Sequence, residues 1–137
     1  MGGPNTHSDI RWPPGVAALT LFTYDLGASK DFYVRVFGIE SLFEDSDSVV
    51  FRFGEVLVNL LRADAAPELI EPGEVAAPGA GHQAVFTLEV DDVDERVNAL
   101  RDQGIPLLNG PVDRPWGPRT ASFCDPSGHI WEIAHND

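Results

Sequence analysis

Residues 124–134 read Cys-Asp-Pro-Ser-Gly-His-Ile-Trp-Glu-Ile-Ala, a turn followed by one last strand. The turn is favoured because proline presets φ, the aspartate side chain can bond the backbone ahead, and glycine accepts positive φ. Side chains alternate along the strand, so Glu132 shares one face with Ile130 and Ala134. Glu132 is therefore a candidate functional residue. It is either a carboxylate facing a cavity, as a metal ligand or general base, or a glutamate that reaches water or pairs with an arginine.

Upstream, the first half of the chain predicts a strand, a helix and three more strands. Residues 16–24 are rich in apolar and β-branched side chains, which is typical of a strand. Asp25 can cap a helix that ends at Gly38. The inward stripe of this helix consists of Leu26, Ser29, Phe32, Tyr33, Val36 and Phe37. Three short strands are expected to follow, at residues 40–44, 48–53 and 56–61.

The second half repeats this order. Residues 83–90 predict a strand, and a D-x-x-E pattern at Asp92 and Glu95 caps a helix that Gly104 closes. The apolar face of this helix carries Val93, Val97 and Leu100. The remaining segments are predicted as a strand at 107–109, a loop at 112–118, and strands at 119–124 and 130–135.

The two halves therefore form an internal duplication. Each has an aspartate at the helix start, a glycine at the helix end and a glycine before its last strand: Asp25, Gly38 and Gly54, then Asp92, Gly104 and Gly128. We expect an α+β fold of two tandem βαβββ modules, which form a curved, cup-like mixed sheet around a cleft. Residues 1–15 are predicted to be a flexible arm. A single domain at 16–137 then contains modules at 16–64 and 82–137, joined by a linker at 65–81.

Composition restricts the partners. The net charge is -13, from 22 acidic and 9 basic residues, and it would repel a phosphate backbone, so no nucleic acid is expected. No apolar run is long enough for a membrane span, and the polar N-terminus carries no secretion signal. These features indicate a cytoplasmic protein without membrane contact. Cys124 is the sole cysteine, which excludes an internal disulfide and favours a small buried thiol over a nucleophile.

The combined pattern resembles the vicinal oxygen chelate superfamily, which comprises glyoxalase I, the bleomycin resistance proteins and the extradiol dioxygenases. The resemblance covers residues 16–135. It rests on the repeated βαβββ unit and on four groups of residues: Asp25-Leu26, Phe32-Tyr33 with Phe37-Gly38, Val90-Asp91-Asp92-Val93, and Asp125 to Glu132. This pattern is specific for the superfamily and not for any one activity.

The resemblance implies four metal-ligand positions, in the first and last strands of each module. They correspond here to Ala18, Asn59, Val85 and Glu132. Only Glu132 is a good ligand, because methyl and isopropyl groups supply no donor atom. We therefore predict no metal cofactor, and enzymatic activity stays open. His82 is an alternative ligand only if a bulge shifts the strand register.

We therefore expect a metal-free, ligand-sequestering protein that binds a small organic molecule and has no cofactor. The predicted ligand-binding residues are Phe22, Leu57, Asn59, Trp116, Arg119 and Glu132, with Arg119 as a partner of Glu132 across adjacent strands. Two alternatives remain open. One is a metal-dependent lyase, isomerase or dioxygenase with a divalent metal, in which Glu132 is catalytic; the other is a scaffold whose cleft is filled by its own side chains. The resemblance also implies a homodimer, whose clefts can combine strands from both subunits.

Overall fold

The computed structural model describes residues 10–136, so most of the predicted arm at 1–15 lies outside the described residues. The first module contains β1 (Ala18–Thr23), α1 (Leu26–Phe37), β2 (Phe43–Glu44), β3 (Ser48–Phe53) and β4 (Val56–Arg62). A 3-10 turn η2 (Ala63–Ala65) and a short helix α2 (Pro67–Ile70) follow. The second module contains β5 (Val85–Glu89), α3 (Val93–Asp102), β6 (Leu107–Asp113), β7 (Arg119–Cys124) and β8 (Ile130–His135).

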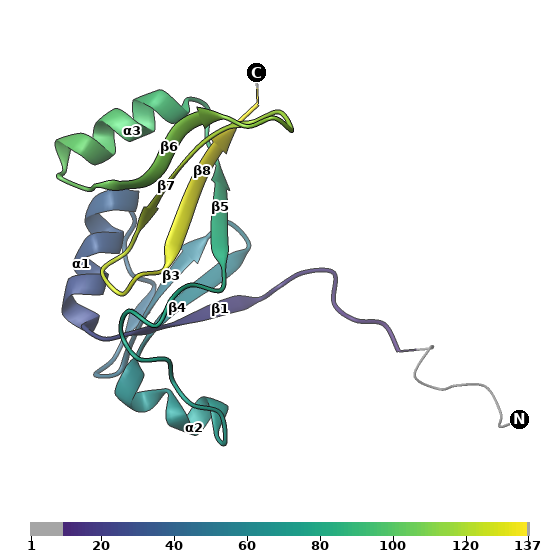
Figure 1. The fold of residues 1–137 in the computed structure, drawn as a ribbon. Coiled ribbons are helices and arrows are strands. Elements are labelled where there is room, and N and C mark those ends of the chain that lie inside the picture. Colours follow the sequence, from purple (N-terminus) through teal and green to yellow (C-terminus); the bar gives the residue numbers. More distant parts are fainter. Residues whose placement is uncertain (1–9, 137) are drawn as a thin grey trace, which may run out of the picture.

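The strands form two four-stranded sheets of the same topology, β1-β4-β3-β2 and β5-β8-β7-β6. In each sheet the first strand pairs parallel to the last strand of its module, and the other pairs are antiparallel. The α+β fold of two βαβββ modules is thus confirmed. Helices α1 and α3 lie on the same side of the molecule (Figure 1). We call the sheet faces that point away from the buried core the open faces.

Local sequence signals place both long helices. The Asp25 side chain accepts a hydrogen bond from Ala28 N over 3.0 Å and begins α1, and Gly38 ends it with φ 66°. Asp92 caps α3 by accepting from Glu95 N over 3.1 Å. Because these caps satisfy backbone groups within one helical turn, the sequence was sufficient to predict them, and both are confirmed.

Three segments differ from the sequence-based expectation. Strand β2 has only two residues, η2 and α2 occupy the start of the linker and the residues just before it, and β6 continues to Asp113 through a region that we predicted as a loop. The β6–β7 register shifts on both sides of Asn109, so β6 continues past Gly110 as an irregular strand. A side chain at Gly110 would lie 2.5 Å from the Thr120 carbonyl oxygen, which shows why glycine is needed at this close approach.

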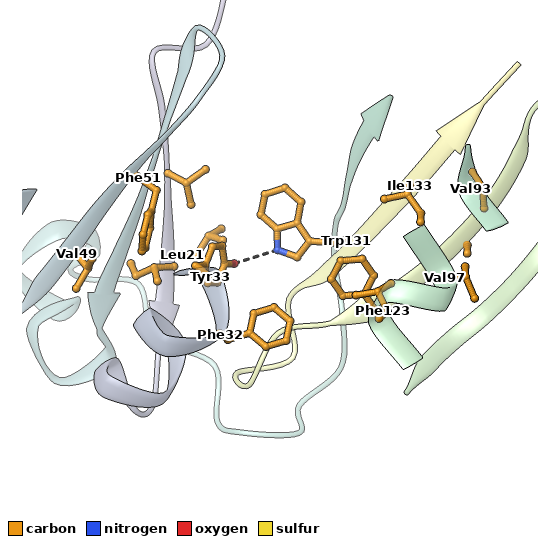
Figure 2. Close-up of a cluster of buried hydrophobic side chains, with 14 residues drawn as sticks. Leu21, Phe32, Tyr33, Val49, Phe51, Val93, Val97, Phe123, Trp131 and Ile133 are labelled. Atoms are coloured by element: carbon orange, nitrogen blue, oxygen red, sulfur yellow. Dashed lines mark hydrogen bonds between the residues drawn. The ribbon is translucent and has the colours of Figure 1, made fainter. Parts of the chain in front are cut away.

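One aromatic core joins the two modules. The indole of Trp131 on β8 lies 5.1 Å from the rings of Phe37 on α1 and Phe53 on β3, and 6.0 Å from Tyr33 on α1. Figure 2 shows Tyr33 and Trp131 pointing toward each other between first-module side chains such as Phe51 and second-module side chains on the other side. The modules therefore share their buried apolar surface.

A buried hydrogen-bond network crosses the same junction. Tyr33 OH donates to Asp125 Oδ2 over 2.7 Å and accepts from Trp131 Nε1 over 3.0 Å. Asp125 Oδ1 also accepts from the backbone N–H groups of Ser127 and His129, both over 2.9 Å. Burial, followed by the negative charge of Asp125, raises the pKa of Tyr33 far above its ordinary value, so this phenol stays a donor. The turn at 125–129 is thereby anchored to α1.

Candidate functional site

Glu132 lies in the middle strand pair of the second sheet, on its open face. Its register partners are Thr87 on β5 and Ser122 on β7. Thr87 Oγ1 donates to Glu132 Oε1 over 2.9 Å, and the Glu132 side chain is half-buried. The neighbouring β8 residues Trp131 and Ile133 are buried in the core, so the predicted alternation is confirmed. Glu132 makes no ion pair with any residue of 10–136. Its second oxygen is therefore available to a ligand.

Asn59 occupies the corresponding position of the first sheet. It lies on β4 with Thr20 of β1 and Val50 of β3 as register partners. Its Oδ1 atom is buried and has no hydrogen-bond partner within the described part of the chain. A buried carbonyl without a donor costs about 1–3 kcal/mol. Asn59 is therefore a polar group that would gain from a donor supplied by a ligand.

The strand register does not place Ala18 and Val85 beside Asn59 and Glu132, although the resemblance implied that these four residues occupy the metal-ligand positions. Ala18 pairs with Leu57, and Val85 pairs with Ile130, so each lies two residues before the true partner of Asn59 or Glu132. The partners are Thr20 and Thr87, which the sequence analysis missed. The signal that could have found them is a threonine at the same place in each duplicated module, two residues after Ala18 and two residues after Val85.

These residues do not fit a tightly bound transition metal. The donors at the two register pairs are one carboxylate, one amide and two hydroxyls, from Glu132, Asn59, Thr20 and Thr87, whereas zinc sites use imidazole, thiolate or several carboxylates. His82 does not change this, because it precedes β5 and is exposed. Within residues 10–136 no three His, Cys, Asp or Glu side chains form a group that could hold a metal ion.

We expect the dialysed protein to contain no stoichiometric zinc, nickel, iron or manganese. Its thermal midpoint should be unchanged in excess chelator, because no set of strong donors would be emptied. Elemental analysis and a thermal melt with and without chelator provide the check. Near-equimolar metal that survives dialysis would contradict this prediction and favour the metal-dependent alternative.

Two cavities border the predicted ligand-binding residues. One of about 410 Å³ lies between β1, the segment at 75–84 and the β7–β8 turn, and Phe22 and His82 line it. Another of about 530 Å³ is lined by Thr87, Glu132 and residues 134–136. Leu57 and Asn59 border neither of these cavities. A single chain therefore does not gather Phe22, Asn59 and Glu132 into one cleft.

Arg119 is not a partner of Glu132, so that prediction was wrong. Arg119 lies opposite His135 in the β7–β8 register. Its Nε and Nη2 atoms donate to the two oxygens of Asp94, each over 2.9 Å, and Nη1 donates to Asp113 over 3.2 Å. This hydrogen bonding lowers the pKa of the Asp94 carboxyl. The long arginine side chain thus reaches α3 and β6, which residue spacing along β7 and β8 did not reveal.

Trp116 lies outside the cavities described above, and His129 and His135 make hydrogen bonds that stabilise local structure. Trp116 is 74% exposed in the β6–β7 loop, with the Arg114 guanidinium carbon 5.7 Å from its ring centroid, and lines neither cavity. His129 Nδ1 contacts Asp125 Oδ2 at 2.8 Å, and His135 Nδ1 accepts from Val93 N over 2.8 Å. Both histidines therefore support turns and helix ends.

Comparison with known proteins places the chain in a family. The Glyoxalase/Bleomycin resistance protein/Dioxygenase superfamily model matches residues 15–133. The uncharacterized protein YraH of Bacillus subtilis is 30% identical over 120 residues, which are 84% of this chain and 93% of YraH.

No helix within residues 10–136 is long and apolar enough to cross a membrane.

Solved structures agree with this match. A glyoxalase/bleomycin resistance protein/dioxygenase from Nocardioides superposes with a TM-score of 0.83 at 25% identity, covering 96% of this chain and 89% of the other. Lactoylglutathione lyase from Agrobacterium tumefaciens gives a TM-score of 0.74 at 25% identity, covering 90% and 94%. The chain therefore belongs to the glyoxalase/bleomycin resistance protein/dioxygenase superfamily, the vicinal oxygen chelate group whose fold its two modules reproduce.

Proposed function

We propose that two copies of this chain pair their open faces and bind a cationic small organic molecule between them, without a tightly bound metal. The observation that carries the proposal is the Glu132 carboxylate, which is half-buried, is held by a hydrogen bond from Thr87, and pairs with no cation among residues 10–136. A fixed carboxylate in a partly desolvated site attracts a cationic or donor-rich ligand.

The open faces support a composite cleft. Figure 1 shows α1 and α3 together on one side of the molecule. Half-exposed apolar side chains, including Phe22, Leu57 and Leu61, lie on the open face of the first sheet, and Val85 on that of the second is 52% exposed. Superfamily members bind small-molecule ligands and often dimerise. In the proposed dimer, the Asn59 face of one copy covers the Glu132 face of the other.

Charge and chemistry favour sequestration of a cation. A net charge of -13 on a small protein raises the local concentration of cations and speeds their association. The cleft would offer Glu132 as a counter-charge and Asn59 Oδ1 as an acceptor, surrounded by apolar side chains. Because the donor set does not fit a tight metal site, no Lewis acid is assigned, and binding is the activity that these residues support.

Glu132→Gln is expected to weaken the binding of a cationic ligand by about ten- to hundredfold, since one charge-assisted hydrogen bond is worth about 1.5–3 kcal/mol. The shape of the side chain is kept, so the fold should survive. We would measure this by calorimetric titration with metal-free bleomycin, a cationic, donor-rich probe whose resistance proteins share this fold.

The matched control is Glu55→Gln, in the exposed β3–β4 turn, which should bind the probe as the unchanged protein does. Equal affinity of the Glu132→Gln variant and the unchanged protein would show that the carboxylate is structural or solvated. Absence of saturable binding to the unchanged protein would count against this ligand class and favour a scaffold role.

A further inference from the structure

A third cavity, of about 380 Å³, lies between the two modules, between the end of α1 and one side of α3, and neither Glu132 nor Asn59 lines it. Its walls are largely apolar and come from α1, β3, β5, α3, β7 and β8. Phenylalanine rings contribute much of this surface, from Phe37 on α1, Phe53 on β3 and Phe123 on β7. Phe37 lies 5.3 Å from Phe53 and 6.0 Å from Phe123, so these rings form one aromatic wall. A cavity of this size and composition suits a small aromatic molecule.

The polar groups of the cavity follow one stripe of α3. Arg96, Ala99 and Gln103 are spaced three and four residues apart, so they lie along one side of the helix, and all three line the cavity. Arg52 and Glu89 also border it. However, their positions in β3 and β5 place both side chains on the open faces, since the neighbouring Phe53 and Leu88 pack against the core. Arg96 is therefore the charged side chain that α3 contributes to this cavity.

Arg96 and Gln103, the two ends of this stripe on α3, each carry a polar group without a hydrogen-bond or ion-pair partner among the described residues. The Arg96 side chain makes no hydrogen bond or ion pair with residues 10–136, although the protein is strongly acidic. Most other basic side chains in the described chain are engaged, including Lys30 with Glu44 and Arg62 with Asp64. At the other end, Gln103 Oε1 is buried and has no hydrogen-bond donor within the described residues. The cavity thus presents a free cation at one end and an unsatisfied acceptor at the other.

We propose that this cavity is a second ligand site, which takes an elongated aromatic carboxylate bearing a hydrogen-bond donor at the end opposite to the carboxylate. The carboxylate pairs with the Arg96 guanidinium, the ring packs on the phenylalanine wall, and the donor satisfies Gln103 Oε1. Seven residues of helix separate Arg96 and Gln103 by about 10 Å along the axis. This separation selects a para-substituted ring with a short side chain over a simple benzoate.

The test is calorimetric titration with 4-hydroxycinnamate. We expect saturable binding that Arg96→Met and Gln103→Met each weaken at least tenfold. Arg101→Met is the matched control, because Arg101 is an exposed arginine on the same helix that does not line the cavity, and it should leave affinity unchanged. Glu132→Gln should also leave it unchanged, so failure here is distinguishable from failure of the open-face proposal.

Two related probes test separately the contact of the ligand's donor with Gln103 and the contact of its carboxylate with Arg96. Cinnamate, which lacks the donor, should bind the unchanged protein several-fold more weakly than 4-hydroxycinnamate, and Gln103→Met should weaken cinnamate no further. The uncharged 4-hydroxycinnamamide should be insensitive to Arg96→Met. If Gln103→Met does not fold, the probe comparison on the unchanged protein decides the matter. No saturable binding of 4-hydroxycinnamate, or binding that neither variant weakens, would overturn the proposal.

Discussion

Asp125→Ala is expected to lower the free energy of unfolding by about 3–5 kcal/mol, because it removes one side of a buried, charged hydrogen-bond network. Asp125 is 5% exposed and accepts from the Tyr33 hydroxyl and from the backbone N–H groups of Ser127 and His129. Its loss would leave those donors without an acceptor and detach the β7–β8 turn from α1. Urea unfolding monitored by circular dichroism measures the change.

The control is Asp102→Ala, at the exposed end of α3, which should leave the unfolding midpoint unchanged. A loss below about 1 kcal/mol for Asp125→Ala would show that water replaces the network at little cost. Asp125→Asn should give an intermediate loss, since it keeps the shape of the side chain and one acceptor oxygen.

The same carboxylate makes stability depend on pH. Burial by itself raises the pKa of Asp125, but the hydrogen bond and charge of His129 and the hydrogen bond from Tyr33 outweigh it, so the pKa lies below its ordinary value. A carboxyl with a lowered folded-state pKa stabilises the protein above its unfolded pKa of about 3.9 and loses that contribution as pH falls through the folded value. The unchanged protein should therefore lose stability below about pH 4, and Asp125→Asn should lose less over that interval.

Trp131→Ala is expected to cost about 3–5 kcal/mol as well, through loss of buried surface and the cavity left behind. Trp131 is 2% exposed and contacts rings from α1, β3 and β5, so it holds both modules to one core. We expect the variant to unfold at lower urea concentration, still in one transition if enough of the shared core remains.

Trp116→Ala is the matched control, because the same substitution is made at a tryptophan that is 74% exposed. It should change the free energy of unfolding by no more than about 0.5 kcal/mol. Equal losses at the two tryptophans would contradict the placement of Trp131 in the shared core.

The features that the sequence predicted are those set by neighbours in the chain. Asp25, Gly38 and Asp92 act within one helical turn, and the alternation along β8 places Trp131 and Glu132 on opposite faces whatever the partner strand is. The internal duplication then supplied the order of elements in both sheets, which is why the fold class followed from one chain.

The features that it missed depend on pairing between distant residues. The choice of Thr20 over Ala18 opposite Asn59 is made by the β1–β4 register, which joins strands separated by a helix and two other strands. The bond between Tyr33 and Asp125 spans 92 residues. Arg119 selects Asp94 on α3 because its side chain is long enough to leave its own sheet. None of these pairings has a local sequence signal.

The most direct test of the composite cleft is a heterodimer with Asn59→Leu in one subunit and Glu132→Gln in the other. Each single-variant homodimer should bind metal-free bleomycin weakly, because every cleft has lost one polar group. The purified heterodimer should regain one site of unchanged affinity, since one of its clefts combines the intact Asn59 face of one subunit with the intact Glu132 face of the other. A heterodimer with no high-affinity site, or a protein that stays monomeric at binding concentrations, would contradict a cleft shared between two copies.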